Sequence, residues 1–381
     1  MDRLGLYLHI PFCRSKCRYC DFCSFTGRSR ETVERYVARL CDDLRAAAPT
    51  CGTYTVDSVF FGGGTPTLLS AEQLTRIAET LKKEYHIADD CEWTAECNPA
   101  TGSPNLFRAM RKAGFNRLSI GLQSAHQEEL RALGRIHDFE DFRRTWEEAR
   151  DAGFDNLNAD VMFGIPYQTP ERFWETLERV CALNPEHLSA YALSLEAGTP
   201  LAKTAHKLPM PNEADVEKMY LSMIEVLAEH GLMQYEISNF SKKGYQSRHN
   251  RKYWNLEQYL GFGPAAYSDF SGERFGNSRD LDAYLRGESI VCERERPSQK
   301  ERENEYVMLR MRLCEGLCDR SFRERFGHGA DAFLSRFERY AEDGFVRQTE
   351  CGAAFTPKGF LVSNSILSDV LEFDGKNAEK T

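Results

Sequence analysis

The sequence lacks an excess of positive charge. Its 381 residues include 49 lysines and arginines against 58 aspartates and glutamates, which gives a formal net charge of −9. Binding to nucleic acid depends on clustered lysines and arginines that neutralise phosphates. The composition therefore argues against nucleic acid as a partner.

Long hydrophobic runs are also missing. No stretch approaches the roughly 20 apolar residues that span a bilayer. The apolar start, MDRLGLYLHIPFC, is short and is interrupted by His9 and Pro11, unlike a signal peptide. We therefore expect a cytoplasmic protein, while the basic string from Arg248 to Lys252 leaves peripheral contact with an anionic membrane open.

Without an export signal, the thirteen cysteines are not expected to form a disulfide framework, because the cytosol keeps thiols reduced. A further pair, Cys314 and Cys318, is spaced for one face of a helix, and a core role is preferred there over a metal site. Small buried side chains with no assigned role are expected at Cys41, Cys51, Cys91, Cys181, Cys292 and Cys351.

Short β-branched or aromatic runs alternate with amphipathic helical patterns over the first two hundred residues. Strands are predicted at 4–10, 57–63, 91–97, 116–124, 157–163 and 187–195. This order indicates an α/β fold with a parallel sheet, curled into a partial (β/α)6 TIM-like barrel. Unusual polar residues follow directly on these strands, where such folds carry their chemistry.

Three units are predicted along the chain. Residues 1–210 form the barrel, and 211–290 form an aromatic, loop-rich extension. After a charged stretch around Pro297, residues 298–375 form a small α+β module that resembles a winged helix.

Cys13, Cys17 and Cys20 form a Cys-x3-Cys-x2-Cys loop in PFCRSKCRYCDF. Three thiolates suit an iron–sulfur cluster with one iron open to a small molecule, whereas zinc usually takes a fourth protein ligand. The run GGGTPT at 62–67 follows one strand–helix unit later. Its glycines allow backbone to approach a ligand closely, and its amides can bind a carboxylate.

The segments YLHIPFC, GGGTPT, ECNP, SIGLQS, GRIH, ADVMFGIPYQT and YEISNF follow one another as in the oxygen-independent coproporphyrinogen oxidase family of radical S-adenosylmethionine (SAM) proteins, which this chain resembles. The resemblance implies a 4Fe-4S cluster on the three cysteines, with SAM on the open iron. It implies SAM contacts from Tyr7, Tyr19, Gly63, Gly64, Thr65, Glu96, Gln123, Arg135 and Asp160.

Two features make the chain more similar to the HemW-type heme chaperones within that family. The oxidases have a fourth cysteine where this chain has Phe22, and they carry an N-terminal extension that is not expected here. The pattern His-Asn-x-x-Tyr-Trp resembles the HemW heme-binding motif. By that resemblance, heme is contacted by His249, Asn250, Tyr253 and Trp254, with His249 as a candidate axial ligand.

The resemblance implies a radical SAM heme chaperone that delivers heme to acceptor hemoproteins such as respiratory enzymes or a bacterioferritin. Reductive SAM cleavage is expected to be weak at most, with flavodoxin or ferredoxin as candidate electron donors and dimerisation left open. No catalytic residue is assigned. The alternatives are an oxygen-independent coproporphyrinogen III oxidase, which decarboxylates propionates, and another radical SAM enzyme acting on a tetrapyrrole.

Overall fold

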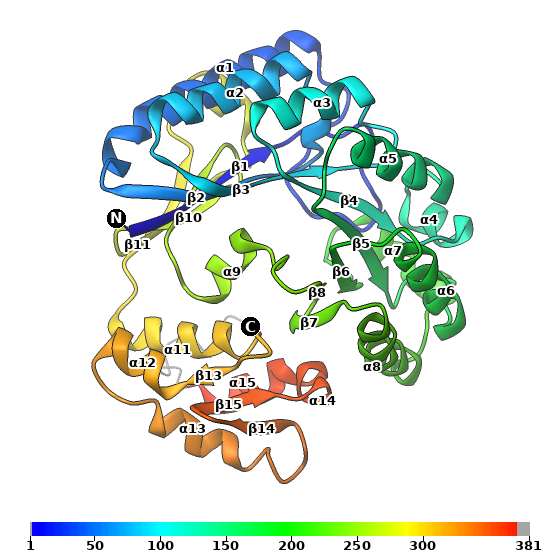
Figure 1. Ribbon diagram of the computed structural model, residues 1–381, viewed down its shortest axis with the longest axis vertical. Coiled ribbons are helices and arrows are strands. Elements are labelled where there is room, and N and C mark those ends of the chain that lie inside the picture. The colour runs from blue at the N-terminus through cyan, green and yellow to red at the C-terminus, as the bar shows by residue number, and fades with distance from the viewer. Residues whose placement is uncertain (1, 372–381) are drawn as a thin grey trace.

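The computed structural model describes residues 2–371 and is built around a 12-stranded sheet (Figure 1). Its central six strands are mutually parallel, and each falls on a predicted strand. They are β1 (Asp2–Ile10), β2 (Tyr54–Gly63), β3 (Ile87–Cys97), β4 (Arg117–Gln123), β5 (Leu157–Phe163) and β6 (His187–Ala192). The predicted α/β fold with a partial barrel is confirmed.

Helices cover the convex face of this sheet (Figure 1). Their starts follow the sequence: Ser70 and Gln73 form a capping box at the second helix, and Asp138 and Asp141 form one at the fifth. The apolar stripe of each helix packs on the sheet. The covering helices are α1 (Arg30–Ala47), α2 (Ala71–Glu84), α3 (Pro104–Ala113), α4 (Gln127–Leu133), α5 (Phe139–Asp151) and α6 (Pro170–Cys181).

The range predicted as an extension, 211–290, supplies strands to both edges of the same sheet, and the last of this series, β12 (Val291–Glu295), lies just beyond the predicted end. After α7 (Pro200–Thr204) and α8 (Glu213–Glu229), two antiparallel strands lie beyond β6. A further strand joins β1 in parallel and begins an antiparallel series at the other edge. The strands are β7 (Met233–Glu236), β8 (Asn239–Ser241), β9 (Tyr259–Phe262), β10 (Tyr267–Phe270), β11 (Glu273–Asn277) and β12 (Val291–Glu295), with α10 (Leu281–Leu285) before the last.

The short helix α9 (Arg248–Trp254) carries the predicted heme motif and lies on the concave side of the sheet (Figure 1). The buried Glu92 carboxylate of β3 accepts hydrogen bonds from the backbone amides of Arg248 and His249, at 3.0 and 3.2 Å. The buried Lys252 ammonium pairs with Asp57 of β2 at 2.8 Å. These contacts hold α9 against the middle of β2 and β3, away from the loops that follow their carboxyl ends.

The C-terminal module has the predicted α+β character. A three-stranded antiparallel sheet, in the order β13-β15-β14, packs with five helices. The elements are α11 (Gln299–Arg310), β13 (Leu317–Cys318), α12 (Asp319–Phe326), α13 (Asp331–Glu338), β14 (Val346–Thr349), β15 (Gly352–Phe355), α14 (Pro357–Leu361) and α15 (Ser363–Val370). The predicted end at 375 lies outside the described residues.

Four cysteines differ from what the sequence predicts. Cys314 and Cys318 do not share a helix face, because α11 ends at Arg310 and Cys318 lies on β13. Cys292 is exposed, and Cys351 is partly exposed, in contrast to the expected burial. Within residues 2–371, no helix is both long and apolar enough to cross a membrane.

Candidate functional site

The cysteine loop joins β1 to α1, and backbone hydrogen bonds connect its two ends. The Cys13 amide donates to the Phe25 carbonyl at 3.0 Å, and the Phe25 amide donates to the Pro11 carbonyl at 2.8 Å. These bonds close the loop into a compact turn. Its three motif cysteines, Cys13, Cys17 and Cys20, are partly exposed and all line one cavity of about 380 Å³.

Cys23 lies outside this arrangement. Its side chain is buried, and its sulfur points to the Arg279 carbonyl at 3.7 Å rather than into the cavity. Phe22 occupies the position of the oxidases' fourth cysteine, is 66% exposed, and lines the cavity. The one-residue shift therefore turns Cys23 away from the other three thiols.

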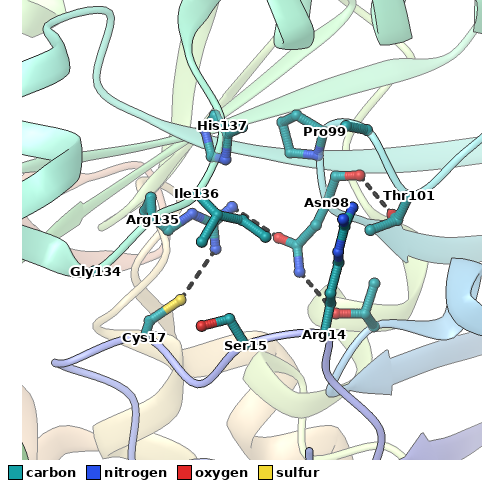
Figure 2. A pocket seen from close by; sticks show the side chains of 12 residues that line it. Arg14, Ser15, Cys17, Asn98, Pro99, Thr101, Gly134, Arg135, Ile136 and His137 are labelled. Carbon is teal, nitrogen blue, oxygen red and sulfur yellow. Dashed lines mark hydrogen bonds between the residues drawn. The ribbon is translucent and has the colours of Figure 1, made fainter. Parts of the chain in front are cut away.

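A hydrogen-bonded chain links Cys17 to Cys13, and Figure 2 shows its part from Cys17 through Arg135 to Asn98. Arg135 Nη1 donates to Cys17 Sγ at 3.4 Å, and its Nη2 donates to Asn98 Oδ1 at 2.7 Å. Asn98 Nδ2 donates to Thr65 Oγ1 at 2.7 Å, and Thr65 Oγ1 donates to Cys13 Sγ at 3.7 Å. Donors aimed at sulfur favour thiolates and tune the electronics of a bound cluster.

These residues fit a cluster held by three thiolates. The three sulfurs face one cavity, and two of them already accept hydrogen bonds. Among residues 2–371, no three His, Cys, Asp or Glu side chains gather as a site for a single metal ion. A 4Fe-4S cluster does not require that convergence, because each thiolate binds a different iron.

The glycine run fits closely against the cysteine loop. A Cβ on Gly64 would lie 2.6 Å from the Phe12 carbonyl oxygen and 2.7 Å from that of Ile10. Gly63 has φ +102° and packs on the His9 ring. Its amide donates to Glu96 Oε2 at 3.0 Å, and the Gly64 amide donates to the Ile10 carbonyl at 2.9 Å. These two amides are engaged within the protein, so the run provides close packing rather than free anion-binding amides.

The cavity walls carry two half-buried carboxyl groups, Glu96 and Asp160. Burial, reinforced by the nearby Asp160, raises the pKa of Glu96 to about 8. Burial also raises the pKa of Asp160, although Asn158 and Ser119 donate hydrogen bonds to it. Although Arg117 and Arg135 also line the cavity, burial still raises both pKa values, so a positively charged ligand such as a sulfonium or an ammonium group would favour the ionised carboxylates.

The structure brings most of the predicted SAM residues to this cavity. Besides the three cysteines, its lining includes Tyr19, Gly63, Gly64, Glu96, Gln123, Arg135 and Asp160. Thr65 instead lines a neighbouring cavity of about 340 Å³, shown in Figure 2, which shares Cys17, Asn98 and Arg135 with the first. Tyr7 does not line either of them: its hydroxyl bonds His9 Nδ1 at 3.0 Å, and its ring stacks on Phe60 and His249.

Sequence reasoning missed several residues of the cavity, foremost Arg117. Its side chain is only 2% exposed, and its Nε has no hydrogen-bond partner among the described residues. Its charge acts to lower the pKa values of Glu96 and Asp160. Alternation along β4 places Arg117, Ser119, Gly121 and Gln123 on one face. Extending that alternation back from Gln123 would have found it. Phe60, Ser189 and Tyr191 also line the cavity.

Of the four predicted heme residues, only Asn250 lines the cavity. His249 is buried, with Nδ1 bonded to Ser58 Oγ at 3.0 Å and Nε2 to the Tyr253 hydroxyl at 2.9 Å. Burial lowers the pKa of His249 to about 3, so the imidazole is neutral. The Tyr253 ring packs edge-on against Tyr259, and Trp254 Nε1 is buried without a hydrogen-bond partner among the described residues.

The chain is similar to radical SAM proteins over nearly its whole length. Residues 7–180 match the radical SAM superfamily, and residues 298–362 match the HemN C-terminal domain. The chain is 32% identical to heme chaperone HemW of Bacillus subtilis over 376 residues, 96% of this chain and 98% of that protein. It is 32% identical to heme chaperone HemW of Escherichia coli over 371 residues, covering 96% and 97%.

Two further matches extend the comparison. Radical S-adenosyl methionine domain-containing protein 1, a mitochondrial protein of Mus musculus, is 39% identical over 272 residues, 70% of this chain and 61% of that protein. The solved structure of coproporphyrinogen III oxidase (HemN) from Escherichia coli superposes with a TM-score of 0.85 at 25% identity, covering 97% of this chain and 90% of that one.

Proposed function

Because this chain belongs to the HemW family of radical SAM proteins, we propose that it is a heme chaperone, which binds heme and passes it to acceptor hemoproteins. One observation carries the proposal: similarity to heme chaperones at 32% identity extends over 96% of the chain and 98% of the Bacillus subtilis relative. A shared superfamily domain alone would not reach the C-terminal module.

The proposed cofactors are a 4Fe-4S cluster on Cys13, Cys17 and Cys20, and SAM beside it. When bound, the cluster supplies one-electron chemistry toward SAM. The chain's own residues position and tune it: Arg135 and Thr65 donate to the cysteine sulfurs, and Asn98 holds both in place. Glu96 and Asp160 favour a cationic ligand, and we expect SAM cleavage to be weak at most.

The proposed heme segment is α9, with His249, Asn250, Tyr253 and Trp254. A neutral imidazole is the form that ligates iron, and the low pKa of His249 keeps it in that form. To bind iron, His249 must give up one of its two hydrogen bonds. Nε2 would lose its bond to the Tyr253 hydroxyl, or Nδ1 would lose its bond to Ser58 Oγ. Heme loading is therefore proposed to displace Tyr253 or to move α9 away from β2.

The proposed partners are acceptors such as respiratory enzymes or a bacterioferritin, with a flavodoxin or ferredoxin as electron donor, in the cytoplasm. A second candidate function is coproporphyrinogen III oxidation, which the TM-score of 0.85 with that oxidase favours. The two functions differ in product, because only the oxidase decarboxylates propionates.

The deciding experiment begins with anaerobic reconstitution of the cluster. Heme is then titrated while its absorption is followed, and SAM, reductant and coproporphyrinogen III are supplied in parallel. Stoichiometric heme binding, heme transfer to an apo-hemoprotein and no decarboxylated product are expected. Turnover to protoporphyrinogen would instead make the protein an oxidase.

His249→Ala tests the heme segment within the same assay. We expect weaker heme binding and an altered heme spectrum. His187→Ala is the matched control, because His187 is equally buried and bonds Asn158 and Tyr235 on the same sheet. Equal effects of the two variants on heme affinity would show that lost packing, not lost coordination, explains the result.

A further inference from the structure

A buried arginine at the start of β4 has no partner in the protein. Arg117 is almost fully buried, and it forms no hydrogen bond or ion pair with any residue that the structure describes. Its side chain lines the cavity of about 380 Å³. Buried charges in proteins are normally paired, because leaving water without a partner costs them free energy. A buried cation that faces a cavity therefore indicates an anionic ligand.

The carboxyl groups of the cavity are bonded to neutral donors instead. Asp160 accepts hydrogen bonds from the Ser119 hydroxyl at 3.1 Å and from the Asn158 amide at 2.7 Å. Glu96 accepts the Gly63 amide at 3.0 Å. The protein thus holds both carboxyl groups in place without giving either to the buried arginine as an ion-pair partner.

Arg117 lies at the end of the cavity that is remote from the cysteine loop. Gly121 follows it by four residues on β4, and the Gly121 carbonyl accepts a hydrogen bond from Arg135, which also contacts Cys17. Asp160 lies opposite Gly121 in the sheet. At a rise of about 3.3 Å per residue, the backbone of Arg117 is roughly 13 Å from this level. An anion at Arg117 is therefore well separated from the cysteines.

The remote end of the cavity adjoins α9. Arg117 pairs with Thr94 of β3 in the sheet register, and Thr94 pairs with Phe60 of β2. The Phe60 ring lines the cavity and stacks on the His249 ring, with the ring centres 5.3 Å apart. Asn250, the next residue of α9, lines the same cavity. The unpaired arginine thus lies at the end of the cavity next to the proposed heme segment.

The other cations of the cavity already have partners. Both Nη atoms of Arg135 donate within the protein, and Lys16 donates to the Phe22 carbonyl at 3.1 Å. Of the cations that line the cavity, Arg117 alone has no partner among the described residues. A guanidinium presents its donors as a planar fork that matches the two oxygens of a carboxylate. A carboxylate is therefore the anion that suits this end of the cavity.

We propose that Arg117 is a carboxylate subsite that binds a propionate of heme. The inference rests on the proposed heme-binding function, because a heme held at α9 carries both propionates on one edge of its macrocycle. SAM, in the arrangement proposed above, lies beside the cluster at the cysteine end and leaves Arg117 to the second ligand. The subsite orients the macrocycle and favours tetrapyrroles that carry carboxylates.

Porphyrin binding to the full-length, cluster-loaded protein tests the subsite. Absorption titrations compare heme and metal-free protoporphyrin IX with their dimethyl esters, whose propionates carry no charge. The unaltered protein is expected to bind each diacid about 10- to 100-fold more tightly than its ester. Arg117→Met should remove this preference, and Arg117→Lys should restore part of it, because lysine keeps the charge without the fork. Equal binding of acid and ester by the unaltered protein, or a preference unchanged in Arg117→Met, would overturn the proposal.

Lys16→Met is the matched control, because it removes a positive charge from the cysteine end of the same cavity. This variant should keep the preference for diacids. Equal loss of the preference in Lys16→Met and Arg117→Met would show that overall charge attracts the porphyrin, and the subsite would be rejected.

Unfolding and SAM titration separate a binding role of Arg117 from other roles. The unaltered arginine has no protein partner to lose, so Arg117→Met should be at least as stable as the unaltered protein. Its SAM affinity, measured by calorimetry, should not fall. Weaker SAM binding with the diacid preference retained would assign Arg117 to the SAM carboxylate and overturn the proposal.

The same titrations distinguish failure of the subsite from failure of the proposed function. Metal-free protoporphyrin has no iron for His249, so its preference over the ester depends on the carboxylates alone. Heme transfer to an apo-hemoprotein without a preference that depends on Arg117 would defeat the subsite and keep the chaperone. The reverse result would keep the subsite and defeat the chaperone, and no binding of any porphyrin would defeat both.

Discussion

Cys20 and Cys23 are three residues apart, yet their side chains have different surroundings. Cys20 lines the cavity with Cys13 and Cys17, whereas Cys23 is buried and faces the Arg279 carbonyl. We expect Cys20→Ser to lose the cluster and Cys23→Ser to keep it, because only the first removes a thiolate ligand. Iron and sulfide content and visible absorption after anaerobic reconstitution check this. A cluster lost in Cys23→Ser and kept in Cys20→Ser would reverse the assignment.

The raised pKa of Glu96 makes the free energy of unfolding depend on pH. Its pKa is raised from 4.5 to about 8 in the folded protein, so the folded state keeps a proton that the unfolded chain releases. The stability from this proton is present in full below 4.5, falls as pH rises through this range, and is lost above about 8. The sign is opposite to that of a salt-bridged carboxylate.

Glu96→Gln tests this expectation, because glutamine resembles the protonated acid. The variant should gain stability over the unaltered protein as pH rises from 5 to 9, by about 1–3 kcal/mol. It should also bind SAM more weakly, since it cannot form the carboxylate that attracts a cation. Thermal unfolding and calorimetric SAM titration measure the two effects, with the exposed Glu175→Gln as control. A stability difference independent of pH would refute the raised pKa.

At the scale of elements, the GGGTPT segment and the cysteine loop are packed together without spare room. A methyl group at Gly64 would meet the carbonyl oxygens of Phe12 and Ile10 at 2.6 and 2.7 Å, both of them backbone atoms. Gly64→Ala should therefore lose about 2–4 kcal/mol of stability and reduce cluster occupancy.

Gly52→Ala is the matched control for this change. Its nearest neighbour would be the Pro49 carbonyl oxygen at 3.8 Å, an ordinary contact distance. Chemical denaturation and iron content after reconstitution measure both variants. Equal stability of the two would show that the cysteine loop adapts to the methyl group.

The helix α9 shows how far sequence reasoning reached at this scale. The pattern His-Asn-x-x-Tyr-Trp identifies the segment in the sequence. Nothing in the pattern predicts that the Glu92 carboxylate, 156 residues before Arg248, accepts hydrogen bonds from two backbone amides of α9. The same holds for the hydrogen bonds of His249, whose partners Ser58 and Tyr253 come from β2 and from α9 itself. Whether the His249 nitrogens are free or hydrogen-bonded depends on how α9 packs against the sheet.

At the scale of the whole molecule, α12 contacts the chain just after α9. Arg325 donates to the Asn255 and Leu256 carbonyls, and its guanidinium also lies 5.3 Å from the centre of the Tyr306 ring. Arg325→Met should cost about 1–3 kcal/mol and speed hydrogen exchange in residues 255–257, because the module is held less firmly.

Arg323→Met on the same helix is the control, because the ion pairs of Arg323 with Asp319 and Asp331 stay within the module. Hydrogen exchange followed by mass spectrometry compares the two variants at residues 255–257. Faster exchange in both would show that α12 itself has loosened, and faster exchange in neither would show that Arg325 does not hold the module to the barrel.

The sequence by itself determined the order of strands and helices, the cysteine loop and the glycine run after the second strand. These depend on local patterns: apolar periodicity, capping residues and the spacing of three thiols within eight residues. Gln123 and Glu96 could also be placed, because residues at the carboxyl ends of neighbouring parallel strands meet at one edge of a sheet, whereas Asp160 lies in the middle of β5.

Only the tertiary structure decided how distant segments combine. It placed β7 to β12 on both edges of the barrel sheet, set Arg117 and Asn250 in one cavity, and engaged both nitrogens of His249. Each of these results depends on contacts between residues remote in sequence, whose pairing is set by the packing of the whole fold rather than by any local pattern.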